Sequence, residues 1–410
     1  MFHPADKCLV YQFVHDKHFA SKSPISVELY SSFELIAPFL HNFDIPIDYL
    51  SCFELFTQNT KNQKTTFCLI HEGGKPVLFT FFQTVLIDYQ NFNNSKSVGL
   101  RNKIIRFILQ IKQIKTLFLG SIFRSGKSAF FVPNGLQLSE SQVINYLHKA
   151  VQKMNQKECF NFVVLKELPF SSQGIAQLQS LGYNTGWSDI QMQMDIHPSW
   201  NSFGDYQSQL SRKYLARSKK IRNKLNEITF TNLSSASITY YESEIYQLYQ
   251  QVIQNQPFVA GTLSVTYFAD LKLKLGNQFE FVLLSIDDKP VGFYSAFVQP
   301  YEYEVYYIGL DYRINQNMYL YFNILFSTLE RAIILQKSKL LLGRTSLDAK
   351  ASMGAQGILY PSVYQSITIP HKLVEHALKY FIQTSSDEWK NRNPFKSNIE
   401  IAEKDLEAIV

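Results

Sequence analysis

The chain has 410 residues, of which 46% are hydrophobic and 18% are charged, and its net charge is +6. This composition supplies enough apolar material for two packed cores and excludes a disordered chain. No run of about 18 apolar residues and no secretory signal occurs, so the sequence predicts a soluble cytoplasmic protein without a transmembrane helix.

The cysteines and histidines show no metal or redox motif. No HxxxH or HExxH spacing occurs, so no metal ion is expected. Gly120–Ser128 looks like a phosphate-binding loop, but five residues separate its glycines where four are needed. Because no CxxC pair occurs either, we expect free thiols in a reducing compartment. The cysteines are Cys8, Cys52, Cys68 and Cys159.

A hairpin-like segment of the first half recurs in the second half without a gap. Phe67–Phe81 aligns with Phe281–Ser295, and six of the fifteen positions are identical. Each copy consists of an apolar run, a Gly-Gly or Asp-Asp pair, Lys-Pro and a second apolar run. This pattern predicts a β-hairpin in each half.

The segments that follow the two hairpins also correspond. After an insertion near residues 84–135, the first half continues with helix, strand, helix and strand at 139–155, 160–165, 171–181 and 189–196. The second half adds a strand at 304–310 and continues with helix, strand, helix and strand at 315–336, 339–342, 347–354 and 359–369. Alternating helices and strands predict an α/β (α+β) fold with mixed sheets flanked by helices.

The simplest explanation of this correspondence is a duplication. We expect a first domain over residues 1–197 and a second over residues 198–410, with a cleft between them. The second domain would begin with a basic helix and end in a C-terminal helical tail.

Basic charge is concentrated in two windows that contain no acid. Eight lysines and arginines lie between Asp88 and Glu140, and seven lie between Asp205 and Glu227. Such concentration favours an anionic partner, although two solvated basic faces are the alternative. Within the first window, residues 104–115 mix apolar and basic side chains. This segment is expected to be a lid, a surface element that contacts an anionic membrane, or a part of its own domain.

The second window has the spacing of an amphipathic helix. Its apolar stripe consists of Leu210, Tyr214, Ile221 and Leu225, and Arg217 falls in the centre of the stripe. An arginine in that place needs an internal carboxylate or a bound carboxylate or phosphate. The other bases of the window divide into a flanking group and a solvated group. They are Lys213, Lys220 and Lys224 beside the stripe, and Arg212, Lys219 and Arg222 on the far face.

A second group of polar residues stands where a strand is expected to end and a short helix to begin. In open α/β sheets, ligands gather at such carboxyl ends. Gly343 relaxes the backbone there, and Arg344 and Lys350 are candidates for binding an anion. The neighbouring Thr345, Ser346 and Asp348 are interpreted mainly as helix-capping residues.

Together these features resemble the tandem GNAT-fold acyltransferase-like proteins. That group includes the Fem-type peptidoglycan aminoacyltransferases and the peptidoglycan biosynthesis/recognition acetyltransferase-like proteins. The residues that carry the resemblance are Leu210–Arg217, Tyr307–Tyr312, Gly343–Lys350 and Gly354-Ala355. The match covers roughly residues 195–370 and is only architectural over 60–195.

The resemblance implies an N-acyltransferase or aminoacyltransferase of cell-envelope or lipid metabolism, with its site in the cleft. The donor would be acyl-CoA, acyl carrier protein or aminoacyl-tRNA. Its binding residues would be Lys213, Arg217, Arg344, Thr345 and Lys350. The general acid would be Tyr214, Tyr307 or Tyr360. The turn that would hold a pyrophosphate, Asp311–Asn317, has no glycine, and its side chains would crowd that group.

Other functions remain open at this stage. A non-catalytic protein with the same basic windows would bind RNA or tRNA, or an anionic envelope or lipid ligand. The expected partners are a small-molecule or carrier-bound anionic substrate, with tRNA and a peripheral membrane contact as alternatives. DNA is not expected.

Overall fold

The computed structural model describes residues 24–56, 63–91, 113–126, 129–256, 258–369 and 392–396. The first half contains β1 (Ile25–Tyr30), α1 (Phe33–Ile36), α2 (Ile47–Phe56), β2 (Gln63–Glu72), β3 (Lys75–Ile87), β4 (Ile114–Leu119), β5 (Phe130–Phe131), α4 (Glu140–Lys157), β6 (Phe162–Leu165), α5 (Ser172–Ser180) and β7 (Asn184–Asp195).

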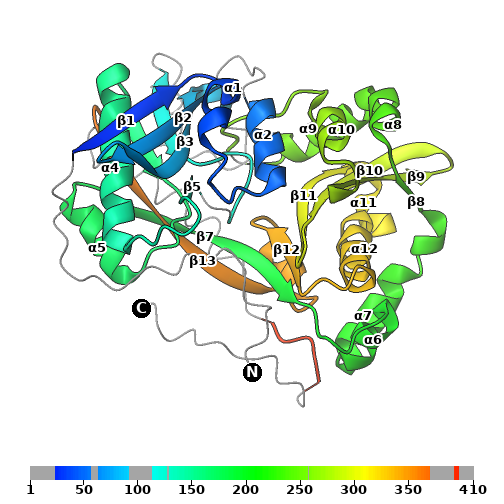
Figure 1. Ribbon diagram of the computed structural model, residues 1–410. Coiled ribbons are helices and arrows are strands. Elements are labelled where there is room, and N and C mark those ends of the chain that lie inside the picture. The colour runs from blue at the N-terminus through cyan, green and yellow to red at the C-terminus, as the bar shows by residue number, and fades with distance from the viewer. Residues whose placement is uncertain are drawn as a thin grey trace.

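From its hairpin onward the second half follows a similar order of elements, and more helices precede that hairpin (Figure 1). It contains α6 (Phe203–Gln209), α7 (Arg212–Arg222), β8 (Thr229–Asn232), α8 (Ser235–Tyr240), α9 (Glu242–Gln254), α10 (Tyr267–Leu275), β9 (Phe279–Ile286), β10 (Lys289–Val298), β11 (Glu302–Leu310), α11 (Tyr312–Met318), α12 (Leu320–Ile334), β12 (Lys339–Gly343), α13 (Leu347–Ala351) and β13 (Gln356–Ser366).

Both expected hairpins are present. β2 pairs with β3 and β9 with β10, each antiparallel. All four turn residues have positive φ: 57° at Gly73, 77° at Gly74, 48° at Asp287 and 60° at Asp288. Positive φ at both central positions is the backbone of a type I′ turn, whose twist matches that of the strands.

The two halves share one continuous sheet. Within the described residues the strand order is β1-β2-β3-β4-β6-β13-β7-β12-β11-β10-β9-β8, and β5 pairs with β3. The last strand of each half is therefore exchanged: β13 pairs with β6 of the first half, and β7 pairs with β12 of the second. The predicted α/β architecture is confirmed, and the exchange joins its two copies. The domain limits and the cleft stay predictions.

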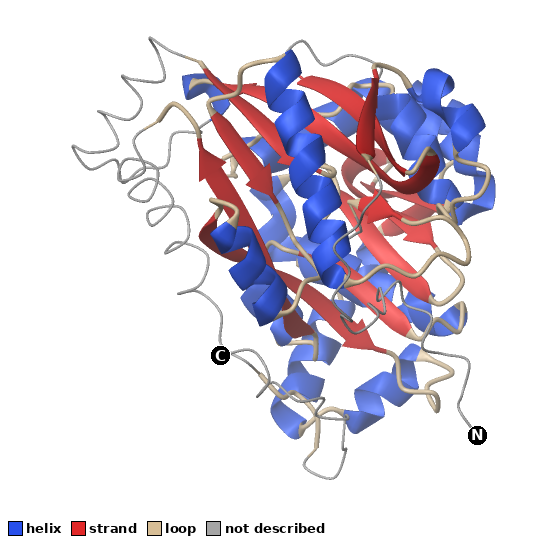
Figure 2. Ribbon diagram, turned by 60° about the vertical axis from the view of Figure 1, so that its left-hand side comes forward, coloured by secondary structure: helices blue, strands red, loops and turns tan. Residues whose placement is uncertain are grey.

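Helices cover both faces of the sheet (Figure 2), and the alternation of the strands explains how. On β2, Phe67 and Leu69 pack toward α1 and α2, whereas Cys68 and Ile70 pack toward α4. β9 repeats the alternation, with Phe281 packing beside α10 and other positions beside α12. Each half thus has two apolar layers.

Three expectations about individual segments need correction or fall outside the structure. The insertion contains a core strand, because residues 114–119 form β4, which pairs in parallel with β6 as β11 pairs with β12. Residues 104–112 of the mixed basic segment, and the expected tail over 370–391 and 397–410, lie outside the described residues.

The helix expected at 315–336 is two helices. The break is at Tyr319, whose φ is 50°. Side chains satisfy backbone groups around it: Asn323 Nδ2 donates to the Met318 carbonyl at 3.1 Å, and Asn315 Oδ1 accepts from the Tyr321 N–H at 3.0 Å. Within the described residues, no helix combines the length and the apolar character needed to cross a membrane.

Candidate functional site

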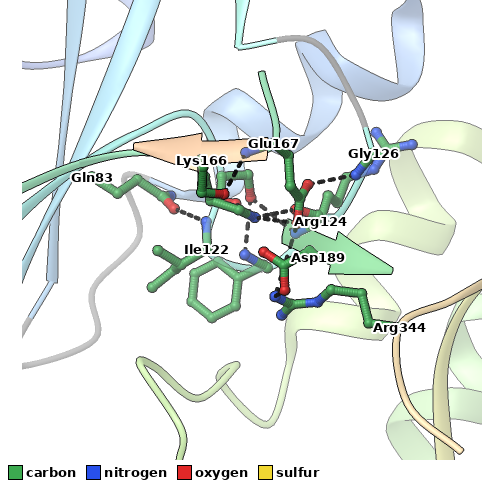
Figure 3. Close-up of polar contacts among 11 residues, drawn as sticks. Gln83, Ile122, Arg124, Gly126, Lys166, Glu167, Asp189 and Arg344 are labelled. Carbon is green, nitrogen blue, oxygen red and sulfur yellow. Dashed lines mark hydrogen bonds and ion pairs between the residues drawn. The ribbon is translucent and has the colours of Figure 1, made fainter. Parts of the chain in front are cut away.

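The exchanged strands bring together the carboxyl ends of β6 and β12. Lys166 and Glu167 directly follow β6, and Arg344 directly follows β12. Asp189 lies on β7, between these two ends in the sheet order. Figure 3 shows the four side chains converging. We call Lys166, Glu167, Asp189 and Arg344 the central cluster.

Arg344 is the most accessible member of the central cluster. Its Nη1 lies 3.1 Å from Asp189 Oδ1 and 3.8 Å from Glu167 Oε1. Burial disfavours its charge, but the two carboxylates outweigh that effect and raise the pKa of the guanidinium. Because 41% of the side chain is exposed, Arg344 is a candidate for binding an anionic ligand.

Glu167 is held in an unusual backbone conformation. Its φ is 53°, and its side chain is only 3% exposed. Oε2 accepts from the Gly126 N–H at 2.5 Å, and the Glu167 N–H donates to Ser362 Oγ at 2.9 Å. Oε1 is buried without a hydrogen bond, although Lys166 Nζ lies 3.3 Å away. Such strain is often retained at functional sites.

Lys166 holds the loop after β4 beside the central cluster through hydrogen bonds. Its buried Nζ donates to the carbonyls of Ser121 and Arg124, at 2.8 and 3.0 Å. Burial lowers the pKa of Lys166, while Glu167 opposes the shift. The loop is thereby positioned against β7, where the side chain of Gln191 packs so closely on Gly126 that a Cβ there would collide with it.

Lys350 is a buried cation beside the cluster. It is 2% exposed, and Nζ donates to the Gly343 carbonyl at 3.3 Å. Burial, and to a smaller extent the charge of Arg344, lowers the pKa of Lys350 to about 7. At neutral pH a substantial fraction of this amine is therefore uncharged.

Two tyrosines adjoin the central cluster. Tyr360 lies directly opposite Asp189 in the β7–β13 ladder, so the two side chains share one face of the sheet. Tyr307 lies on β11, which pairs with β12 over Glu302–Glu304 before the strand ends diverge. Burial, then Tyr249, raises the pKa of Tyr307 well above its ordinary value, while Arg344 opposes the shift. Its phenol therefore stays protonated near neutrality.

The structure brings some of the predicted site residues together and separates others. Lys350 and Tyr307 interact electrostatically with Arg344, and the exposed Thr345 follows it. Tyr360 lies opposite Asp189, the partner of Arg344. Ser346 stands at the N-cap of α13 with φ 55° but makes no side-chain cap. Asp348 instead pairs with Arg392, at 2.6 Å.

Lys213, Tyr214 and Arg217 lie on α7, at one end of the molecule (Figure 1). The expectation that Arg217 lies in the buried stripe is wrong: Ser218 and Ile221 face the core, while Arg217 is exposed over the Phe322 ring at 4.7 Å. Arg222, expected to be solvated, is instead partly buried.

Sequence reasoning missed a second buried cluster that joins the halves. Arg124 Nη2 lies 2.9 Å from Asp48 Oδ2 and 2.6 Å from Glu304 Oε2, and its side chain is completely buried. The guanidinium also lies over the rings of Tyr49 and Phe297, at 4.7 and 4.1 Å. The signal was its apolar neighbourhood, since Ile122-Phe123 precede it.

Sequence reasoning also missed Lys166 and Glu167, the two residues of the central cluster that follow β6. The duplication itself was the signal, because Lys166-Glu167 and Arg344 each follow the corresponding strand of their own half. Across the described residues, no three His, Cys, Asp or Glu side chains gather in a way that could hold a metal ion. The group best suited to an anionic ligand is Arg344.

Comparison with protein-family models finds no match, and comparison with curated proteins finds none. Similar solved structures include a tandem GNAT protein from the clavulanic acid biosynthesis pathway, 8% identical, with a TM-score of 0.48 over 85% of this chain and 99% of that one. FemX is 9% identical, with a TM-score of 0.47 over 85% of this chain and 100% of that one.

The L-PGS of Bacillus licheniformis is 13% identical, with a TM-score of 0.42 over 66% of this chain and 85% of that one. These solved structures include FemX and a tandem GNAT protein, which are of the group that the sequence resembles.

Proposed function

We propose that the protein transfers an acyl or aminoacyl group from an activated ester or thioester to an amine, at the central cluster. One observation carries the proposal: a half-exposed arginine, two carboxylates and a protonated tyrosine converge where the exchanged strands meet. Perturbed ionisable groups gathered in this way are typical of functional sites.

The chemistry assigns a role to each group. The amine nitrogen attacks the donor carbonyl, a C–N bond forms, and the C–O or C–S bond to the leaving group breaks. The ammonium of the acceptor must lose a proton, for which the carboxylates of Asp189 and Glu167 are the candidate bases. The leaving oxygen or sulfur must gain a proton, and Tyr307 is the candidate donor, with Tyr360 as the alternative. Arg344 and Thr345 would hold the anionic part of a substrate.

Lys350 and the residues of α7 have different places in this proposal. Lys350 is enclosed and partly uncharged, so we assign it to supporting Arg344 rather than to binding an anion. Lys213, Tyr214 and Arg217 lie on α7 and are left out of the site. Tyr214 hydrogen-bonds to Arg392, the partner of Asp348 on α13.

The start of α11 bears on the choice of donor. Asp311 Oδ1 accepts from the Arg313 N–H at 3.0 Å, and Asp311 also pairs with the Arg313 guanidinium at 2.6 Å. The Arg313 hydrogen bond lowers the pKa of Asp311, so the carboxylate stays charged. The Asp311 side chain already accepts from a backbone N–H at the start of α11, and no glycine opens the turn, which disfavours a pyrophosphate there. This favours acyl carrier protein or an aminoacyl ester over acyl-CoA.

The proposal is tested by a thermal-shift panel followed by product detection. The panel contains acetyl-CoA, a long-chain acyl-CoA, acyl carrier protein, aminoacyl-tRNA and anionic lipid. A donor at about a hundred times its Kd adds about 2.7 kcal/mol and should raise the melting temperature by a few degrees. Mass spectrometry with a mixture of amines should then show an acylated product. Stabilisation without product would instead indicate the non-catalytic binding protein.

A further inference from the structure

Helix α7 presents an exposed face that is basic along its whole length. The helix contains no acidic residue, and its buried positions are Ser218 and Ile221. On a helical wheel the exposed side chains fill the opposite arc. The exposed cations are Arg212, Lys213, Arg217, Lys219 and Lys220.

Within the described residues, little charge balances this face. Among the ion pairs of the described residues, those of this segment are Arg222 with Glu330 and Lys224 with Glu227, and none involves the five exposed cations. The exposed Lys396 adds a further cation, since its backbone N–H donates to the Gln209 carbonyl just before α7. Uncompensated cations of this density attract a polyanion.

One row of the face combines cations with aromatic rings. Lys213 Nζ lies 5.9 Å from the ring of Tyr214, and Lys220 Nζ lies 5.9 Å from the ring of Tyr319. Arg217, between them on the row, lies 4.7 Å from the ring of Phe322 and is exposed on its outer side. A guanidinium plane backed by a ring is a platform on which an unpaired base can stack.

We propose that the exposed face of α7 docks single-stranded RNA, with its cations on the phosphates and Arg217 against a base. A membrane is less suitable, because none of the exposed large apolar side chains of the described residues belongs to α7. A nucleic-acid duplex offers phosphates but no unpaired base for Arg217. The proposal does not depend on group transfer at the central cluster, none of whose four residues belongs to α7.

Binding is measured by the fluorescence anisotropy of a labelled, mixed-sequence RNA strand of about 20 nucleotides, between roughly 50 and 200 mM NaCl. Five phosphate contacts predict a slope of log K against log salt of about −3.5. The triple variant Lys213→Gln, Arg217→Gln, Lys220→Gln should bind roughly tenfold more weakly or worse, and the slope should shrink by about 2.

Helix α4 supplies a matched control. Lys149, Lys153 and Lys157 are exposed and form a similar row, so changing all three to glutamine removes the same charge elsewhere. This variant should bind RNA like the native protein. Arg217→Lys should keep the slope but weaken binding severalfold, because the planar stacking group is lost.

Several results would overturn the proposal. They are the absence of RNA binding at the lowest salt, equal weakening by both triple variants, and native affinity of Arg217→Lys. Tighter binding to phosphatidylglycerol vesicles or to duplex DNA than to the RNA strand would also overturn it. Circular dichroism of each variant confirms that the exposed substitutions leave the fold intact.

Discussion

Among single residues, Lys350 departs most clearly from its ordinary chemistry. It is buried beside Arg344, and its hydrogen bond is to the Gly343 carbonyl rather than to a carboxylate. Burial disfavours its charged form, so the folded protein binds this proton more weakly than the unfolded chain does. A lysine kept under such conditions costs stability near neutrality, which is consistent with a role in the site.

Lys350→Met should therefore stabilise the protein in a pH-dependent way. The pKa of Lys350 is about 7 in the folded state and about 10.4 in an unfolded chain, so the cost is complete below pH 7 and disappears as the pH rises through this window. The advantage of methionine should be several kcal/mol at low pH and shrink by about 1.4 kcal/mol per pH unit above pH 7.

Urea unfolding between pH 6 and 9 measures this difference. Lys149→Met, at an exposed position of α4, is the control and should change stability by less than about 0.5 kcal/mol. A stabilisation by Lys350→Met that is the same at every pH would show that the lysine is not forced toward its neutral form.

At the scale of elements, the two hairpins form the same type of turn with different residues. The first uses Gly73-Gly74 and the second Asp287-Asp288, all with positive φ. Glycine adopts positive φ without strain, whereas the Cβ of aspartate makes this left-handed conformation less favourable. The two hairpins therefore allow a Gly-Gly pair and an Asp-Asp pair to be compared in the same turn geometry.

Asp288→Gly should raise the free energy of unfolding by about 0.5–1 kcal/mol, because it removes the strain at φ 60°. Gly74→Asp should lower it by a similar amount. At Gly74 a Cβ would meet no atom within 4 Å, so the cost there is that of the backbone alone. Chemical denaturation measures both variants, and a loss of stability in Asp288→Gly would contradict this explanation.

Elements of this kind were predictable from sequence, while their pairing was not. Local signals, namely apolar periodicity and turn pairs, identified both hairpins and about half of the described helices. The helices that they missed are α1, α2, α6, α8, α9 and α10. The exchange of β7 and β13 cannot be seen in the local sequence, because the apolar pattern of a strand does not depend on which strand it pairs with. Arg344 could be selected from its place after a strand. Asp189 and Glu167 become its partners only through the exchange.

For the molecule as a whole, the continuous sheet and the buried Arg124 bind the halves together. Asp48 and Arg124 come from the first half, and Glu304 comes from the second. Gln299 Nε2 donates to both carboxylates, at 3.0 and 3.1 Å. We therefore expect the protein to unfold as one cooperative unit rather than half by half.

Arg124→Met should lower the free energy of unfolding by about 3–5 kcal/mol, because two buried carboxylates lose their cation. Lys64→Met, which removes one cation from the more exposed pair with Glu158, should cost at most about 1 kcal/mol. Urea unfolding followed by both circular dichroism and fluorescence measures the two effects. Separate transitions with the two probes would contradict the expectation of a single cooperative unit.

The most direct test of the proposed site compares Arg344→Ala with a matched arginine. Arg331 is 38% exposed and pairs with the buried Glu280, so Arg331→Ala removes a similar ion pair away from the central cluster. The measurement is the rise in melting temperature that the best donor of the panel causes in each protein. We expect this rise to persist in Arg331→Ala and to vanish in Arg344→Ala. An equal rise in both variants would contradict a donor site at the central cluster.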